Sequence, residues 1–202
     1  MNSVSNLLIN AFVLLSFSLL SSCVTRLPTP DGVKEISLSD YEVLVRSKTQ
    51  DSRVYNGFTN QLEIFATRID AEMNDGLLSH SARLYQWNSA KYSDERNKTL
   101  LRQGSQSEIM MSFFTPERKN DDLNRSQSLW KIYLEVDGIR YEGKATKDKR
   151  NLTELQVLFP HHNRWFTPYL ISFPISTSLS ERKLVILIVT GPAGSSQLTF
   201  NN

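Results

Sequence analysis

The chain of 202 residues carries 23 Lys and Arg against 21 Asp and Glu, a formal net charge of +2, with 40% hydrophobic and 22% charged residues. These values are ordinary for a folded globular protein and exclude a disordered chain, and the net charge is too small to indicate a nucleic-acid partner. The single cysteine, Cys23, excludes an internal disulfide framework and a cysteine-based metal cluster.

The first 23 residues have the pattern of an export signal. Residues 7–20 form an apolar run without charge, which is too short to span a bilayer comfortably as a permanent helix. Leu20-Ser21-Ser22-Cys23 follows, and this tetrapeptide resembles the lipobox of bacterial lipoproteins. The stretch before the apolar run differs from a usual signal peptide because it lacks Lys and Arg. An uncleaved anchor or a buried apolar segment is the alternative interpretation.

The resemblance to bacterial lipoproteins covers residues 1–23 only, and it implies a signal peptide over residues 1–22, cleavage before Cys23 and a lipid on that cysteine. The implied modification is a diacylglyceryl thioether, with a further acyl chain such as palmitate on the new amino group. Two or three chains make a stable anchor, because each buried methylene contributes about 0.8 kcal/mol. Val24 stands where lipoproteins retained in the inner membrane of enteric bacteria show Asp. The resemblance therefore favours a lipid-anchored protein of the outer membrane.

Residues 23–36 are predicted to be the lipidated cysteine and a flexible tether, because Pro28, Pro30 and Gly32 interrupt any apolar periodicity. A single β-rich globular domain is expected over residues 37–202, a length that normally folds as one unit. Alternating apolar residues predict strands over residues 41–45 and 62–66, with a turn at residues 55–58 between them.

The region around residues 67–103 predicts one or two helices that pack one face onto a sheet. Its apolar residues recur near helical spacing, at Ile69, Met73, Leu77, Leu84 and Trp87. Gly76 is expected to interrupt the first helix. Ser93 or Asp94 is expected to cap a second helix that ends at Gln103.

The remaining sequence predicts short strands separated by turns. The expected strands cover residues 109–114, 129–136, 139–142, 155–159, 169–173, 184–189 and 197–200. Asp137-Gly138 is the strongest hairpin signal, and a second turn is expected at residues 191–194. Residues 184–189 lack polar alternation and predict a central strand buried on both faces. The predicted fold is mainly β: an antiparallel β-sandwich, immunoglobulin-like in broad architecture, with a helical insertion or flank.

One candidate contact site is the aromatic loop, which we define as His162, Arg164, Trp165 and Phe166. The preceding residues are polar and typical of a loop, so the aromatic rings could be exposed for recognition. Core packing is the alternative explanation for these rings.

A second candidate is the basic segment, which we define as Lys144, Lys147, Lys149 and Arg150. Only Asp148 opposes these four cations locally, so the segment could contact anionic lipid headgroups or an acidic envelope polymer. A solvated loop that maintains solubility is the alternative explanation.

No catalytic residue, metal ligand or cofactor is predicted. His161-His162, with His80 or an acidic residue as a third ligand, is the histidine set to consider, but adjacent imidazoles rarely point the same way and no zinc-binding spacing is present. The sequence has no GxSxG motif. Residues 191–196 lack the GK[ST] ending of a phosphate-binding loop.

The leading hypothesis is a lipid-anchored envelope protein whose domain serves interaction or structural support and is not an enzyme. An anchored enzyme such as a hydrolase, with dispersed site residues, stays open. So does a small-ligand or glycan binder that uses the aromatic loop. The expected partners are the membrane, through the lipid on Cys23, and another envelope protein or an envelope polymer.

Overall fold

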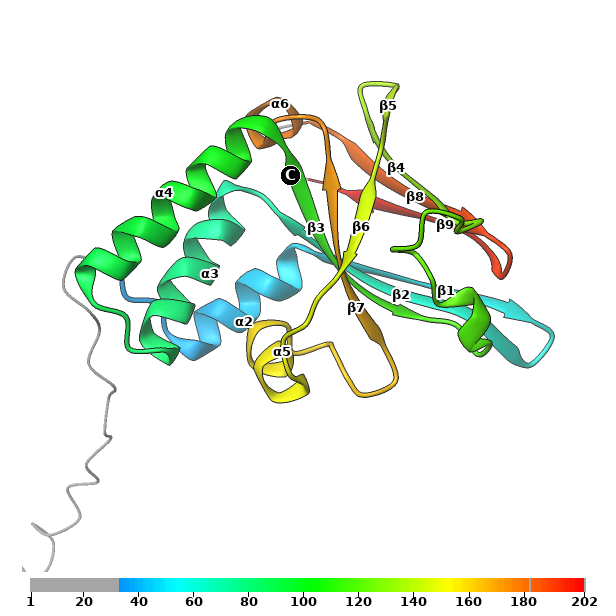
Figure 1. Ribbon diagram of the computed structural model, residues 1–202, viewed down its shortest axis with the longest axis horizontal. Helices are drawn as coiled ribbons and strands as arrows, with labels where there is room; N and C mark the ends of the chain where they lie inside the picture. Colours follow the sequence, from blue (N-terminus) through cyan, green and yellow to red (C-terminus); the bar gives the residue numbers. More distant parts are fainter. Residues whose placement is uncertain (1–32, 182, 202) are drawn as a thin grey trace, which may run out of the picture.

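The computed structural model describes residues 33–181 and 183–201, and within them the chain forms two antiparallel sheets flanked by helices (Figure 1). The five-stranded sheet has the order β1-β2-β3-β7-β6 and the four-stranded sheet the order β5-β4-β8-β9. The strands are β1 (Thr49–Asn56), β2 (Thr59–Ile69), β3 (Ser107–Phe114), β4 (Lys131–Val136), β5 (Ile139–Glu142), β6 (Lys144–Lys147), β7 (Thr167–Phe173), β8 (Val185–Gly191) and β9 (Gly194–Phe200). The helices are α2 (Leu38–Ser47), α3 (Ala71–Leu84), α4 (Ser89–Ser105), α5 (Leu152–Leu158) and α6 (Thr177–Ser180), with a 3-10 turn η1 (Arg118–Asn120).

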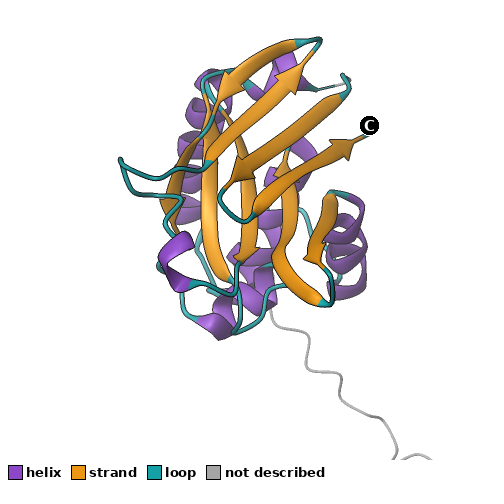
Figure 2. Ribbon diagram, turned by 90° about the vertical axis from the view of Figure 1, so that its right-hand side faces the viewer, coloured by secondary structure: helices purple, strands orange, loops and turns teal. Residues whose placement is uncertain are grey.

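The main hydrophobic core lies between the two sheets. Ile64, Met111 and Tyr169 of the five-stranded sheet share one buried cluster with Leu134 and Leu187 of the four-stranded sheet. Figure 2 shows the strands of both sheets from the side opposite the helical layer. Residues of one strand that face this core alternate with residues that face outward, as a pleated strand requires.

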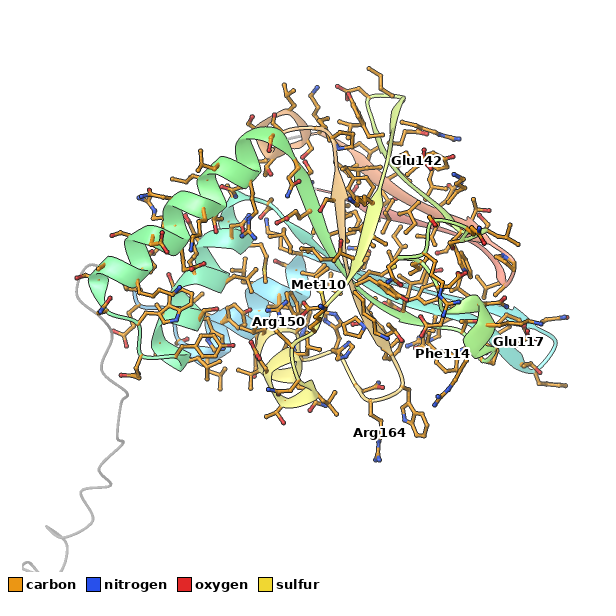
Figure 3. All side chains as sticks on the ribbon, in the orientation of Figure 1. Met110, Phe114, Glu117, Glu142, Arg150 and Arg164 are labelled. Carbon is orange, nitrogen blue, oxygen red and sulfur yellow. The ribbon has the colours of Figure 1, made fainter. Side chains whose placement is uncertain are left out.

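A second, smaller core lies between the helices and the outer face of the five-stranded sheet. Tyr41 of α2, Met73 of α3 and Leu155 of α5 pack there against Met110 of β3, which is labelled in Figure 3. Met110 therefore faces the helices, whereas its neighbour Met111 faces the other sheet. Helix α4 is the outermost helix, and Thr99 is its one buried residue.

Gly143 lies where the chain passes from one sheet to the other. It separates β5 of the four-stranded sheet from β6 of the five-stranded sheet, and its N–H donates to the Ile132 carbonyl at 2.8 Å. A Cβ atom at this position would lie 2.5 Å from Phe173 Cε1 and 2.8 Å from Ile171 Cγ2. Only glycine leaves room here for the Ile171 and Phe173 side chains of β7.

The predicted hairpins and the central strand are confirmed. Asp137 and Gly138 have φ values of 51° and 78°, as both central residues of the expected turn require. Gly191 pairs with Gly194 across the second turn, and β8 lies between β4 and β9 with most of its apolar side chains buried. The mainly antiparallel β prediction is thus confirmed, and the helices flank the five-stranded sheet.

The strand predicted over residues 41–45 is wrong, because this segment belongs to helix α2. Ser37 caps the helix and accepts a hydrogen bond from the Asp40 N–H at 3.0 Å. Tyr41 and Val45, one helical turn apart, are buried, whereas Val43 is exposed. The alternating apolar residues are typical of a strand, but Tyr41 and Val45 are also spaced i, i+4, which places them on one face of a helix.

The strand predicted over residues 155–159 is also wrong, because the short helix α5 covers most of it. Asn151 caps this helix by accepting a hydrogen bond from the Glu154 N–H at 2.9 Å. Leu155 and Leu158, at i, i+3 spacing, are its buried residues.

Two expected helix boundaries differ from the structure. Gly76 lies inside α3 and does not interrupt it, and a Cβ atom there would collide with Leu44 of α2. Asn88 caps α4 in place of Ser93 or Asp94, so this helix begins earlier than predicted.

The proposed signal peptide, Cys23 and the tether up to residue 32 lie outside the described residues. Within residues 33–181 and 183–201, no helix combines the length and the apolar character needed to cross a bilayer.

Candidate functional site

A groove of about 1070 Å³ lies at the end of the five-stranded sheet where β3 ends and β7 begins. Its walls come from four separate parts of the chain: the β1–β2 hairpin, the segment from the end of β3 through η1, the end of β6, and the loop before β7. The antiparallel register brings these parts together, because Glu63 of β2 pairs with Phe114 of β3 and Phe113 of β3 pairs with Thr167 of β7.

The apolar wall of the groove is centred on Phe65. Its ring meets the Phe166 ring edge-on at 5.5 Å and stacks on the His161 ring at 5.5 Å. The guanidinium of Arg53 lies over the same ring at 5.6 Å. Phe114 adds a further edge contact to Phe166 at 6.2 Å between ring centroids.

Trp165 projects from this wall into solvent, with 71% of its surface exposed. Its backbone N–H donates to Asn163 Oδ1 at 2.9 Å, which fixes the turn of the loop. The Arg164 guanidinium lies 5.6 Å from the Trp165 ring centroid, and Figure 3 shows the Arg164 side chain extending away from the ribbon at the edge of the molecule.

The cationic side chains of the groove are unequally neutralised. Arg53 binds Glu63, with 2.7 Å between Nε and Oε1, and this pair satisfies both groups. Arg118, Lys147 and Arg164 have no acidic partner within the described part of the chain. Three cations of the groove therefore have no ion-pair partner in the described chain.

The groove's other carboxylate, Asp121, is already engaged by neutral donors. Its oxygens accept from Thr167 Oγ1 at 2.5 Å and from the Tyr169 hydroxyl at 2.9 Å. Burial, together with the Asp121 charge, raises the pKa of Tyr169, so this tyrosine remains a donor. Asp121 thus positions the start of β7 and forms no ion pair with the cations of the groove.

Three residues of the groove wall carry a buried polar atom for which the described residues provide no hydrogen-bond partner: Asn60 Oδ1, Thr115 Oγ1 and His161 Nε2. Thr115 is the most enclosed of them, with 8% of its surface exposed. Burial lowers the pKa of His161 to about 4, and neighbouring His162 adds to the effect. The His161 ring is therefore neutral near pH 7. Buried polar atoms of this kind are satisfied by water or by a ligand.

The structure separates the members of the aromatic loop. Arg164, Trp165 and Phe166 line the groove, but Phe166 is only 9% exposed and acts as part of the wall. His162 does not line the groove: it is 2% exposed and its Nδ1 lies 2.8 Å from Ser112 Oγ. Burial lowers the pKa of His162, and the Asp148 charge opposes this shift.

The basic segment is also divided, and half of it is not a loop. Lys144 and Lys147 belong to edge strand β6, and Lys147 is the member that reaches the groove. Lys149 is exposed on the loop after β6. Arg150 turns inward, where it binds Asp148 with 2.5 Å between Nη2 and Oδ2 and lies over the Phe159 ring at 5.7 Å. Arg150 thus forms an intramolecular ion pair, and its contact with an anionic partner stays a prediction.

The charge of Asp148 holds the Arg150 side chain in its inward orientation. Burial opposes ionisation of its carboxyl, but the hydrogen bonds from Arg150 outweigh burial and lower the pKa of Asp148.

His80 lies apart from the groove, in the helical layer, where its ring stacks on Tyr41 with 4.0 Å between centroids. Among residues 33–181 and 183–201, no three His, Cys, Asp or Glu side chains gather closely enough to hold a metal ion.

Comparison of the chain with models of protein families, with curated proteins and with solved structures finds no match. The structure itself shows a mainly antiparallel β protein with two sheets, a helical flank and a cationic, aromatic groove at one sheet end.

Proposed function

We propose that this protein is a lipid-anchored component of the bacterial envelope, in the outer membrane, and that its folded domain is a non-enzymatic binding domain. The anchor is proposed on the lipobox-like tetrapeptide ending at Cys23. The observation that carries the binding function is the groove, in which an aromatic wall lies beside three cations without an ion-pair partner among the described residues. Clefts that combine apolar walls with a few polar groups are the usual form of binding sites.

The position of the groove agrees with a tethered role. The described chain begins on the helical side, whereas the β1–β2 hairpin extends to the opposite side (Figure 1). The segment from Cys23 to Val33 can reach at most about 35 Å when extended. A partner at the groove would therefore approach the side of the domain remote from the attachment point.

The proposal also includes a more specific fold for the two sheets. We infer a β-sandwich that is immunoglobulin-like in broad architecture only, and the buried cluster shared by the two sheets supports it. The helical layer on the five-stranded sheet is an addition to that architecture.

The enzyme alternative gains no support from the contact between Ser112 and His162. Ser112 and His162 are both buried and neither lines the groove. A substrate in the groove would meet the aromatic wall and not this pair.

Thiol labelling in the intact envelope tests the anchor and the groove together. Cys23 is the only cysteine, so a lipid thioether at that residue would leave the wild-type protein without a free thiol. A Pro116→Cys variant then introduces one thiol at the groove, and a Phe58→Cys variant introduces one at the exposed tip of the β1–β2 hairpin outside the groove. Each is treated with a maleimide, first in intact envelopes and then after purification in detergent.

We expect the wild-type protein to remain unlabelled even when denatured. The Pro116→Cys variant should react at least fivefold more slowly in envelopes than after purification, whereas the Phe58→Cys variant should react equally in both. A labelled wild-type protein would contradict lipidation at Cys23. Equal reactivity of the Pro116→Cys variant in both settings would contradict the use of the groove for binding.

A further inference from the structure

We infer that the ligand of this groove is an acidic glycan, a chain of sugars that carries carboxylate or phosphate groups. The inference rests on the proposed function, because it names the ligand class of the same groove. Three independent features of the groove support it: an exposed aromatic ring, unpartnered polar atoms in the wall, and cations without an ion-pair partner in the described chain.

Trp165 provides a flat surface for a sugar ring. It is 71% exposed, and the guanidinium of Arg164 lies over its ring at 5.6 Å. An exposed ring that combines a large apolar face with a polar edge is suited to a ligand that is itself amphipathic. A pyranose has such a character, because its C–H groups form an apolar face and its hydroxyls surround it.

The unpartnered atoms in the wall match hydroxyl groups. Asn60 Oδ1 can only accept, Thr115 Oγ1 can donate or accept, and His161 Nε2 takes the role that its tautomer allows. A sugar hydroxyl both donates and accepts, so one kind of group has the hydrogen-bonding capacity that all three atoms require. These atoms are buried, and leaving such an atom without a partner is unfavourable.

An extended acidic peptide fits the groove less well. Peptides that bind as added strands pair their backbone with a free strand edge. Most residues of the wall lie in turns and loops, β2, β3 and β7 each have a neighbour on both sides, and the edge strands β1 and β6 contribute only Arg53 and Lys147. A ligand of the groove therefore contacts mainly side chains. The unpartnered atoms of the wall favour a ligand with hydroxyl groups over a continuous peptide backbone.

The charge of the ligand follows from Arg118, Lys147 and Arg164. These cations lie in the groove without an acidic partner in the described chain, whereas Arg53 is neutralised by Glu63. Charge complementarity therefore requires negative groups on the ligand. A neutral glycan would satisfy the ring and the hydroxyl partners but would leave the cations unpaired.

The test measures binding of the full chain, purified in detergent, to three soluble polymers. Polygalacturonate provides acidic sugars, amylose provides neutral sugars, and polyglutamate provides the same negative charge without hydroxyls. The informative variants are Trp165→Ala, Thr115→Val and Arg118→Gln. The matched controls are Phe58→Ala, which removes an exposed aromatic ring outside the groove, and Lys119→Gln, which removes the cation next to Arg118 that binds Glu117.

We expect polygalacturonate to bind at least tenfold more tightly than amylose or polyglutamate. Trp165→Ala should weaken polygalacturonate binding about tenfold or more, and Thr115→Val about fivefold to tenfold, the usual effect of one lost hydrogen bond. Arg118→Gln should weaken this binding and reduce its salt dependence. The two controls should bind as the wild-type protein does, and thermal melts of all variants confirm that each is folded.

Equal binding of polygalacturonate and amylose, or no effect of Trp165→Ala and Thr115→Val, would overturn the acidic-glycan inference. Equal binding of polyglutamate, unaffected by Thr115→Val, would also overturn it and would assign the groove to an acidic protein segment. In either case, protection of the Pro116→Cys thiol in envelopes would keep the proposed binding function. Loss of that protection would contradict both the acidic-glycan inference and the proposed binding function.

Discussion

Trp165 and Phe166 are adjacent aromatic residues, and replacing each with Ala should give opposite results. Phe166 is 9% exposed, and its ring lies 5.5 Å from that of Phe65 and 6.2 Å from that of Phe114. Removing a buried phenylalanine ring costs about 3–5 kcal/mol of unfolding free energy. Because this site borders the groove, water can occupy part of the space, and we expect the lower end of that range.

Trp165 is 71% exposed, so Trp165→Ala should change the free energy of unfolding by no more than about 0.5 kcal/mol. In a protein of this size, 1 kcal/mol shifts the melting temperature by about 2–4 °C. Phe166→Ala should therefore lower the melting temperature by roughly 6–12 °C, and Trp165→Ala by less than about 2 °C.

Thermal melts and urea unfolding of the two variants measure these effects, and the maleimide assay on the Pro116→Cys background measures groove occupancy. Trp165→Ala should abolish protection of the thiol while the protein stays folded. A loss of stability in Trp165→Ala as large as that in Phe166→Ala would show that Trp165 packs in the core, and it would then be withdrawn from the binding site. A melting temperature of the Phe166→Ala variant equal to that of the wild-type protein would refute the packing of Phe166 against Phe65.

Gly138→Val should lower the unfolding free energy by about 1–3 kcal/mol, because the φ of 78° at Gly138 disfavours a β-branched residue although no neighbouring atom would clash with its Cβ. An unchanged melt would contradict the turn, and Gly104→Ala, at an open helical position, is the control. Acidification should destabilise the protein: burial lowers the pKa of His80 from 6.5 to about 4, so the unfolded state binds more protons between these values and stability is lost as pH falls from 6.5 toward 4. The free energy of unfolding measured in urea should be about 2 kcal/mol lower at pH 5 than at pH 7 because of His80 alone. An equal difference between the two pH values in the His80→Phe variant would reject this origin. Cys23→Ser should accumulate unprocessed precursor and lose labelling by a fatty-acid analogue, and persistent labelling would disprove lipidation at Cys23.

The strand pattern of the second half of the chain could be predicted because its signals are local. Asp137-Gly138 specifies a turn by its own conformational preferences, and the flanking strands β4 and β5 then pair across it. The apolar run of β8 likewise predicts a strand with neighbours on both sides.

The two segments assigned wrongly share a physical cause. Residues 41–45 and 155–159 are short and apolar, so their periodicity fits both a strand and one turn of helix. The deciding features are the caps, Ser37 and Asn151, whose side chains accept hydrogen bonds from N–H groups three residues later. Both caps are visible in the sequence and could have corrected the prediction.

The groove itself could not be predicted, because it exists only through strand register. Phe65, Phe114 and Phe166 are far apart in the sequence and meet because β2 pairs with β3 and β3 with β7. The aromatic loop identified one side of this groove. The opposite side, from the β1–β2 hairpin and Thr115 to Arg118, has no motif that distinguishes it from other turn regions.

The basic segment shows why a run of charge does not define a charged site. Four cations near Asp148 in the sequence look equivalent, yet the fold pairs Arg150 with Asp148, exposes Lys149 and brings Lys147 into the groove. The groove's cations without an ion-pair partner among the described residues instead combine Lys147 with Arg118 and Arg164, from two other parts of the chain. Because each of these three cations comes from a different segment, the fold must be intact for the groove to attract an acidic ligand. Binding should therefore be lost together with tertiary structure, whereas contact through an isolated basic loop would survive unfolding.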